Sequence, residues 1–462
     1  MASPRPTGAP DLADAPFRAA DYRAFRFTRA WFDKPTLTAH LEYALDDEIH
    51  FEERIEFPGA SAAAERADQP AFEEALRLLH LIAGVSYFKT AAPPEIAVET
   101  GPVSAAEAEF LTALYRNGLG EFAWVNNLDL TAHRWFRPSG ERPRAVPAPE
   151  LIRRVAVPIG GGKDSVVSLE LMRAAGEPVV PFAVGLPEPI ARTIERSGLD
   201  HVGAQRTLSE KLMALNDRGA LNGHVPVTAV VSAIAVTAAV LHGFDTIVMS
   251  NERSASSGSF DWHGMDVNHQ WSKGIEFETA FRATLERAVP GLDYFSLLRP
   301  ASELSIARAF AGLTDYHDVF TSCNRVFRRD PTRRGAGWCT DCPKCRFVFL
   351  ILAPFLEPGK LSGIFGRDML ANLDQLDGFR ALMGLGADKP FECVGEVQES
   401  MAALRLVAEA DCWRDHAVVS ALVEEATPLF DERSDPERVL QLNAEHHLPA
   451  RLEPVVHARL GP

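Results

Sequence analysis

The stretch VAVPIGGGKDSVVSLELMRAAG, residues 155–176, changes from a strand pattern to a helix pattern across three consecutive glycines. We predict a strand over residues 153–159 and a helix over residues 165–175, because β-branched residues precede the glycines and helix-forming residues follow them. Since glycine has no Cβ atom, the backbone N–H groups at the start of this helix stay accessible and attract phosphate together with the helix dipole. The turn therefore predicts a phosphate site, and the alternative is a tight strand–helix turn that binds no ligand.

The residues that follow the glycines favour the phosphate interpretation. Lys163 can supply a positive charge, Ser165 a hydroxyl group, and Asp164 a carboxylate that holds Mg²⁺. The spacing differs from the G-x-x-x-x-G-K-[ST] loop of kinases and GTPases and from the G-x-G-x-x-G loop of dinucleotide-binding folds. The predicted phosphate-binding residues are Gly160, Gly161, Gly162, Lys163, Asp164 and Ser165.

Around this turn the chain divides into three predicted parts. Residues 1–145 have the pattern of a β-rich α+β domain, which ends in a linker dense in proline and arginine, RPSGERPRAVPAPEL. Residues 146–345 alternate strand and helix patterns, which predicts an α/β fold with a doubly wound parallel sheet and helices on both faces. Residues 346–462 have the pattern of a helical C-terminal region.

The composition limits the classes of partner. A net charge of −16 over 462 residues argues against a protein that binds nucleic acid through a basic surface. The N-terminus lacks the basic and apolar regions of an export signal, and six cysteines in a chain of this size do not suggest a disulfide framework. The apolar run over residues 225–244 contains Thr228, Ser232, Thr237 and His242, so we predict a buried helix rather than a membrane span. We expect a cytoplasmic protein with no nucleic-acid partner and no membrane partner.

The sequence GGGKDS after a strand resembles the PP-loop of the N-type ATP pyrophosphatases, which is usually written SGGxDS. The resemblance implies an adenine nucleotide α-hydrolase-like domain that binds ATP and Mg²⁺, cleaves ATP between the α and β phosphates, and attaches AMP to an oxygen of the substrate. It also implies that the backbone at the end of the second strand, at Phe182 and Val184, reads the adenine edge. The chain departs from the motif at Gly160, where the family usually has serine, so one side-chain contact to phosphate is lost.

Three polar loops fall at the same edge of the predicted sheet, where ligands bind in α/β folds. In LNGHVPVTAV, VMSNERSASSG and DVNHQWSKGIEFE, histidine or arginine stands near asparagine. Taken singly, each loop also fits helix capping or a solvated surface. Together they favour a site with Asn222, His224, Asn268, His269, Gln270 and Lys273, in which Ser250, Asn251, Glu252 and Arg253 contact the nucleotide.

With the β-rich N-terminal unit and the stretch KPFECVGEVQES at residues 389–400, these loops resemble a particular PP-loop family. It is the family of UDP-N-acetyl-α-D-muramoyl-L-alanyl-L-glutamate epimerases of bacterial peptidoglycan synthesis, and the resemblance extends from around residue 25 to residue 400. It implies a small-molecule substrate, a UDP-linked muramoyl dipeptide, whose terminal L-glutamate carboxylate is adenylated with ATP. The α-carbon is then inverted to D-glutamate, and hydrolysis of the adenylate yields AMP, with pyrophosphate as the other product.

Inversion requires a group that removes the α-proton and a group that returns a proton to the other face. Adenylation helps, because a free carboxylate would place a second negative charge on the enolate. The candidates are His224, His263, His269, Lys273 and Cys393. Histidine titrates near neutral pH, so His269 and His224 rank first. Cys393 also fits a buried core cysteine.

Four cysteines have the count and spacing of a structural zinc site. CTDCPKC places Cys339, Cys342 and Cys345 in a C-x2-C-x2-C pattern, and Cys323 lies upstream. The 7-cyano-7-deazaguanine synthases, a different PP-loop family, carry a similar cluster that binds zinc; the alternative here is a group of reduced, packed cysteines. The segment between the cysteines holds an arginine cluster that fits either a diphosphate group or a solvated loop: Arg325, Arg328, Arg329, Arg333 and Arg334.

Two other functions fit the same glycine loop. One is another adenylating PP-loop enzyme, such as a 7-cyano-7-deazaguanine synthase or a tRNA-modifying enzyme. The extra N-terminal unit and the long C-terminal region argue against the first, and the acidic charge argues against the second. The other function is that of a non-catalytic nucleotide-binding protein, which the intact Lys163, Asp164 and Ser165 disfavour.

Overall fold

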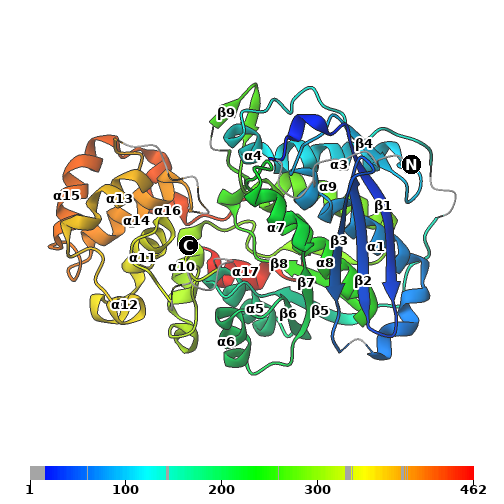
Figure 1. The fold of residues 1–462 in the computed structure, drawn as a ribbon. Coiled ribbons are helices and arrows are strands. Elements are labelled where there is room, and N and C mark those ends of the chain that lie inside the picture. Colours follow the sequence, from blue (N-terminus) through cyan, green and yellow to red (C-terminus); the bar gives the residue numbers. More distant parts are fainter. Residues whose placement is uncertain are drawn as a thin grey trace, which may run out of the picture.

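The computed structural model describes residues 16–59, 61–141, 145–258, 260–327, 335, 337–386, 390, 392 and 394–462. Its centre is a nine-stranded sheet in the order β11-β8-β5-β6-β7-β3-β2-β1-β4 (Figure 1). The strands of this sheet are β1 (Ala24–Asp33), β2 (Thr38–Leu45), β3 (Ile49–Glu56), β4 (Glu95–Val98), β5 (Ile152–Pro158), β6 (Val179–Val184), β7 (Val202–Thr207), β8 (Phe244–Met249) and β11 (Asp293–Ser296). A separate hairpin consists of β9 (Phe260–Trp262) and β10 (Met265–Val267).

The strands from β11 to β7 are parallel to one another. The chain begins this half at β5, moves outward through β6 to β7, and then returns to β8 on the other side of β5. The loops after β5 and β8 therefore lead in opposite directions and leave a crevice at the carboxyl ends of the strands, where open α/β sheets bind ligands. The expected α/β class is confirmed, and the strand and helix predicted around the glycines are observed as β5 and α5 (Lys163–Ala174).

Helices cover both faces of the parallel half. Along β5, Ala156 belongs to one hydrophobic core, whereas Val155 and Val157 belong to the other, as the two-residue period of a strand requires. The first core contains residues of α1 (Pro70–Ala83), α8 (Val227–His242) and α9 (Ile275–Ala288). The second contains residues of α5, α6 (Glu188–Ser197), α10 (Glu303–Ala311) and α11 (Pro343–Leu352).

The N-terminal strands continue the same sheet. Strand β3 pairs antiparallel with β7, and at this junction Arg206 Nε donates to Oε1 of the buried Glu53 at 2.7 Å. The remaining helices of this part are α2 (Val85–Phe88), α3 (Ala105–Gly118), α4 (Gly120–Val125) and α7 (Glu210–Asp217). The two units predicted on either side of residue 145 thus share one sheet, and the boundary itself stays a prediction.

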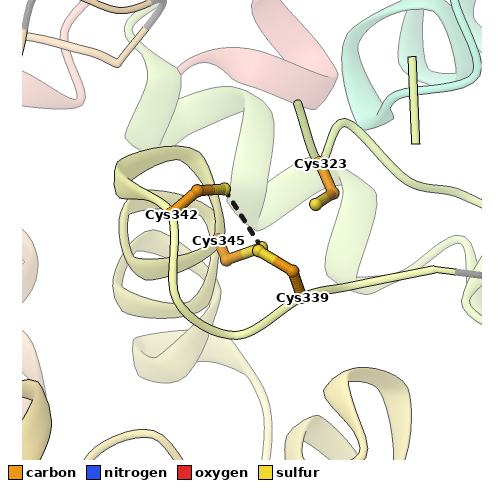
Figure 2. Close-up of side chains that lie close together, drawn as sticks. All are labelled: Cys323, Cys339, Cys342 and Cys345. Atoms are coloured by element: carbon orange, nitrogen blue, oxygen red, sulfur yellow. Dashed lines mark hydrogen bonds between the residues drawn. The ribbon is translucent and has the colours of Figure 1, made fainter. Parts of the chain in front are cut away.

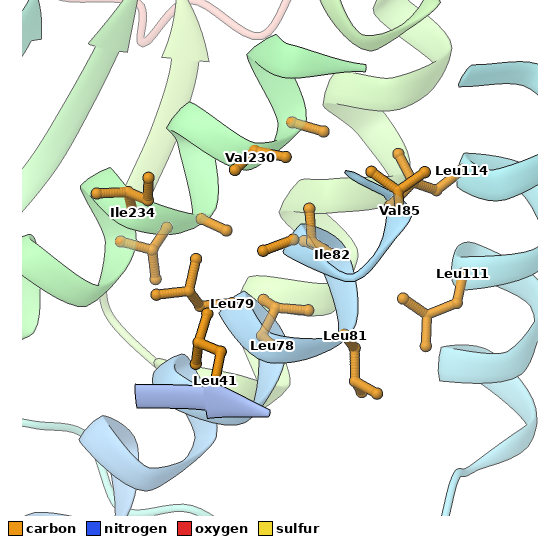
Figure 3. Close-up of a cluster of buried hydrophobic side chains, with 14 of the residues drawn as sticks. Leu41, Leu78, Leu79, Leu81, Ile82, Val85, Leu111, Leu114, Val230 and Ile234 are labelled. Atoms are coloured by element: carbon orange, nitrogen blue, oxygen red, sulfur yellow. The ribbon is translucent and has the colours of Figure 1, made fainter. Parts of the chain in front are cut away.

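Figure 3 shows that these units also share a core. Helix α1 lies between α8, which contributes Val230 and Ile234, and α3, which contributes Leu111 and Leu114. The apolar run at residues 225–244 is therefore the buried helix α8, as predicted. Among the residues that the structure describes, we find no helix with the length and apolar character to span a membrane.

The described residues after position 346 form helices and no strand. Most of these helices pack beside the sheet as a separate group, whereas the last one returns to contact α5 and α10 (Figure 1). They are α12 (Pro358–Phe365), α13 (Leu376–Leu382), α14 (Val397–Glu409), α15 (Ala417–Ala426), α16 (Pro436–Val439) and α17 (Glu453–Leu460).

One histidine of the N-terminal core makes the stability of the fold depend on pH. His80 is fully buried in α1, and its Nε2 lies 2.9 Å from the carbonyl oxygen of Glu42. Burial lowers the pKa of His80 from 6.5 to about 4. The unfolded chain therefore takes up a proton below pH 6.5 that the folded chain does not. We expect the free energy of unfolding to fall by about 3 kcal/mol from this group as the pH drops from 6.5 to 4.

Urea unfolding at a series of pH values measures this effect. The variant His80→Gln, which keeps a hydrogen-bonding side chain but does not titrate, should lose stability less steeply over this window than the wild type. The matched control is His201→Gln, because His201 is exposed. Parallel curves for the wild type and His80→Gln would contradict the prediction.

Candidate active site

The glycine turn between β5 and α5 has a backbone that requires glycine at one position. Gly161 has a φ of +80°, and a Cβ atom there would lie 3.3 Å from the backbone of Pro189. Gly162 is the N-cap of α5. Ser165 Oγ accepts a hydrogen bond from the Gly160 N–H at 3.3 Å and donates one to the Gly162 carbonyl at 3.2 Å. Ser165 therefore braces the turn whose backbone N–H groups we predict to bind phosphate.

Gly160 is the position at which the chain departs from SGGxDS. A Cβ atom there would meet no other atom within 4 Å, and Gly160 does not have a positive φ. A serine would therefore fit, and nothing in the structure explains the glycine.

A cavity of about 420 Å³ opens at the carboxyl ends of β5, β6 and β8. Nine of the predicted residues line it: Gly160, Gly162, Asp164, Ser165, Phe182, Val184, Ser250, Asn251 and Lys273. Four polar or aromatic residues that we did not predict for this site also line it: Thr228, Ser322, Phe327 and Lys344. Lys344 lies within the cysteine motif, whose spacing gave no signal that its lysine faces a pocket.

Lys163 is held inside the protein rather than in the lining of this cavity. Its side chain is 4% exposed, and its ammonium group donates to the carboxylates of Asp164 and Glu303. Burial alone would lower the pKa of Lys163, but the two carboxylates outweigh it and raise the pKa. For Asp164, burial opposes ionisation, yet Lys163 and Lys344 lower its pKa. Lys163 thus acts first as the partner of the buried Glu303 and of Asp164, whose side chain is 30% exposed.

A second buried carboxylate continues this network. Glu399 accepts a hydrogen bond from the Glu303 backbone N–H at 2.8 Å and one from the Glu396 backbone N–H at 2.8 Å. Burial, followed by the charges of Glu303 and Glu396, raises the pKa of Glu399 to about 7. The sequence carried no signal for Glu303 or Glu399, because both stand in ordinary helix-start patterns.

The structure brings three of the five candidate catalytic residues together. The rings of His224 and His269 lie 5.7 Å apart between centroids, in an edge-to-face arrangement. Lys273 lines the cavity and donates a hydrogen bond to Gln270 Oε1 at 3.2 Å. Burial, then the charges of His269 and Lys273, lower the pKa of His224 to about 4. His224 is therefore neutral at physiological pH and has a ring nitrogen able to accept a proton.

A buried arginine that we did not predict fixes the loops that carry these groups. Arg299 donates to the carbonyl oxygens of Glu252, at 2.8 Å, and of Lys273. It also forms an ion pair with Glu278 at 2.9 Å, and both side chains are almost fully buried. The loop after β8 and the loop before α9 are thereby held to one guanidinium group.

Two polar residues after β8 line the cavity but differ in their hydrogen bonding. Asn251 donates to Ser296 Oγ at 3.0 Å, whereas the buried Ser250 Oγ has no hydrogen-bond partner in the described part of the chain. A buried hydroxyl without a partner costs free energy unless a ligand or water satisfies it. The partnerless hydroxyl of Ser250 therefore fits a polar ligand bound in this cavity.

Other predicted residues lie elsewhere. Arg253 does not line the cavity, because its guanidinium donates to the carbonyls of Gln441 at 3.0 Å and Val439 at 3.2 Å and so ties the loop to α16. Glu252 is buried and does not line the cavity. His263 is exposed in the turn of the β9–β10 hairpin. Cys393 and the arginines at 328, 329, 333 and 334 lie outside the described residues.

The four predicted zinc ligands converge (Figure 2). Their Sγ atoms all lie within 4.8 Å of one another, with Cys345 at 3.7 Å from Cys339 and at 3.5 Å from Cys342. Cys323 and Cys345 are buried, and all four are free thiols. The cluster adjoins the cavity, because Ser322 and Lys344 are its neighbours in the chain and line the cavity wall.

Comparison with known proteins matches almost the whole chain to one family. A model of the MurL N-terminal domain matches residues 16–297, and a model of the MurL C-terminal domain matches residues 319–437. Three relatives bear the name UDP-N-acetyl-α-D-muramoyl-L-alanyl-L-glutamate epimerase. The protein from Xanthomonas oryzae pv. oryzae is 44% identical over 95% of this chain and 97% of its own length. The protein from a Micromonospora species is 45% identical over 92% of this chain and 96% of its own length. The protein from Salinispora tropica is 47% identical over 87% of this chain and 88% of its own length.

Proposed function

This chain belongs to the MurL family, and we propose that it is an epimerase that acts on UDP-N-acetyl-α-D-muramoyl-L-alanyl-L-glutamate. The observation that carries the proposal is the identity of 44–47% to relatives of that name over nearly the whole chain. The reaction inverts the α-carbon of the glutamate residue in a small UDP-linked precursor of peptidoglycan. The matches favour this function over a 7-cyano-7-deazaguanine synthase, a tRNA-modifying enzyme or a non-catalytic protein.

We infer that the parallel half of the sheet is a doubly wound PP-loop domain and that it binds ATP and Mg²⁺. The support is the GGGKDS turn beside the central strand, the cavity at the carboxyl ends of β5 and β8, and the partnerless Ser250 hydroxyl. Asp164 supplies an ionised carboxylate for Mg²⁺ at the cavity wall. Phe182 and Val184 supply apolar surface for the base. Bound ATP supplies AMP to the glutamate carboxylate and so removes the negative charge that opposes loss of the α-proton.

The grouped histidines fit the proton transfers that inversion requires. His224 is neutral near pH 7, and His269 lies beside it in edge-to-face contact, so the two imidazoles offer neighbouring ring nitrogens for these transfers. Lys273, in the cavity wall, places a positive charge where negative charge develops on the substrate. The role of Cys393 as an acid or base stays a prediction. The ATP, the UDP-linked substrate and the reduced thiols fit a cytoplasmic enzyme.

One incubation tests the function. The protein, ATP, Mg²⁺ and UDP-MurNAc-L-Ala-L-Glu are mixed in D₂O, and AMP, the deuterium content of the glutamate α-carbon and the configuration of glutamate after acid hydrolysis are measured. We expect AMP, deuterium and D-glutamate to appear together. Absence of both deuterium and D-glutamate would contradict the epimerase proposal. Epimerisation without AMP would contradict only the adenylation step.

Removing the imidazole of His269 should separate activation from proton transfer. For His269→Gln we expect deuterium incorporation to slow by on the order of 10²-fold or more, because one positioned acid or base is lost, while AMP formation persists. The matched control is His263→Gln, an exposed histidine of the neighbouring hairpin. Equal incorporation rates in His269→Gln and the wild type would exclude His269 from the proton transfers.

A further inference from the structure

We propose that Cys323, Cys339, Cys342 and Cys345 bind one structural Zn²⁺, and that this ion holds Ser322 and Lys344 in the wall of the nucleotide cavity. The part that concerns Lys344 rests on the proposed function, because it assumes that the cavity binds ATP.

The sulfur positions fit a tetrahedral zinc site. Zn–S bonds are about 2.3 Å long, so the sulfur atoms of a tetrahedral Zn(Cys)₄ site are about 3.8 Å apart. In this protein the measured separations are 3.5 Å for Cys342–Cys345 and 3.7 Å for Cys339–Cys345, and all four sulfurs lie within 4.8 Å of one another. The four sulfurs lie close together and are not joined by disulfides, so they leave a centre of the right size for one ion.

The backbone conformation between the cysteines is energetically unfavourable at one residue. Thr340, between two of the cysteines, has a φ of +54°, which is unfavourable for a β-branched residue. Cys342 is the N-cap of α11, so it stands at the start of the helix that carries Cys345. Zinc binding offsets such strain, since a structural zinc site contributes its binding free energy to folding.

Positive side chains flank the four cysteines in the chain. A Zn(Cys)₄ site carries a net charge of −2, and Lys344 lies between two of its ligands in the chain. Arg325 and Arg346 lie close in sequence to Cys323 and Cys345, and both pair with Asp341, at 2.5 Å and 3.3 Å. These cations, which outnumber Asp341, offset part of the negative charge of such a site in a protein whose overall charge is negative.

The cluster is tied directly to the glycine turn. The Thr321 N–H donates to the Gly161 carbonyl at 2.9 Å, and Ser322 Cβ lies 3.4 Å from the place where a Cβ atom of residue 162 would be. Cys323 follows immediately. On the other side of the cluster, the first turn of α11 carries Lys344 into the cavity wall and Cys345 into the metal site.

A zinc ion would therefore join the two segments that form one wall of the cavity. Burial raises the pKa of the Asp164 carboxyl, but Lys163 and then Lys344 are close enough to lower it. The positive charge of Lys344 thus stands next to the predicted phosphate site, whereas the ammonium of Lys163 already pairs with Asp164 and Glu303. We therefore assign to Lys344 the contact with phosphate that Lys163 was expected to make. In this proposal the zinc ion holds Lys344 in position.

Metal content tests the first part of the proposal. The full-length protein is dialysed exhaustively against metal-free buffer and analysed by mass spectrometry, with one Zn²⁺ per chain expected. Replacement with Co²⁺ should produce thiolate-to-cobalt charge-transfer bands and the visible bands of a tetrahedral site. Cys345→Ser should lose the metal, while Cys412→Ser, which changes an exposed cysteine outside the cluster, should keep it. A wild-type protein without zinc that gives no cobalt–thiolate bands overturns the site, even if the serine variant fails to fold.

Lys344→Gln tests the second part. This variant should retain one Zn²⁺ per chain and form AMP roughly 10- to 100-fold more slowly than the wild type, because one positive charge at the phosphate site is lost. Unchanged AMP formation would overturn the role of Lys344. If the wild type binds zinc but forms no AMP, the proposed ATP chemistry and the role of Lys344 are both wrong. The zinc site would still be supported by the metal analysis.

Discussion

Replacing Asp164 with asparagine should slow AMP formation by on the order of 10²- to 10³-fold, because the variant keeps the shape of the side chain but removes its charge. Asp164 lines the cavity directly after the glycine turn. Burial opposes its ionisation, but Lys163 and Lys344 lower its pKa, so the group is a carboxylate at neutral pH. A neutral amide binds Mg²⁺ far less well than a carboxylate, and we expect higher Mg²⁺ to restore part of the lost rate.

The measurement is the initial rate of AMP release at several Mg²⁺ concentrations. Asp200→Asn serves as the control, because Asp200 is exposed in the loop before β7. Thermal unfolding of both variants shows whether the loss is one of chemistry or of fold. A folded Asp164→Asn protein with the wild-type rate of AMP release would show that the GGGKDS turn does not have the assigned role.

The largest effect on stability should come from Lys163→Met. We expect this variant to lower the free energy of unfolding by about 3–5 kcal/mol, since it removes the partner of the fully buried Glu303 and of the partly buried Asp164. Lys163 and Glu303 have side chains only 4% and 3% exposed, so water cannot replace the lost pairing. The loss can be read from urea unfolding at pH 7, with Lys211→Met, at an exposed position of α7, as the control.

A double-mutant cycle shows whether the pairing causes this loss. Adding Glu303→Gln to Lys163→Met removes one of the stranded charges, while Asp164 still has the charges of Lys344 and Lys273 nearby. The double variant should therefore be about 1–3 kcal/mol more stable than the sum of the two single effects predicts. Additive losses would mean that Lys163 stabilises the fold through packing rather than through its ion pairs.

Much of the parallel half was predictable because its signals are local. The β-branched run, the three glycines and the helix-forming run occupy one continuous stretch, and the structure places β5, the turn and α5 there. The same holds for the buried helix α8, which has apolar residues on every face. The polar loops were predicted to meet because parallel strands share a carboxyl edge, and His224, His269 and Lys273 do lie near one another.

The site residues that were missed or misplaced depend on distant partners. Arg253 stands next to residues that line the cavity, yet its guanidinium reaches carbonyl groups nearly two hundred positions along the chain. Glu303 and Arg299 hold the glycine turn and the polar loops, although their own sequence surroundings resemble ordinary helix starts and turns. No pattern within one segment records such contacts.

By itself, the sequence of this protein determined the glycine turn, the alternation of strand and helix, and the residue types at the carboxyl edge, because propensity, periodicity and spacing act within a few residues. Only the tertiary structure decided that β3 pairs with β7, so that the N-terminal strands extend the same sheet. It also decided that Lys163 pairs with Asp164 and the buried Glu303, while Lys344 lines the cavity. These outcomes depend on which groups are desolvated together, and that is settled by long-range packing.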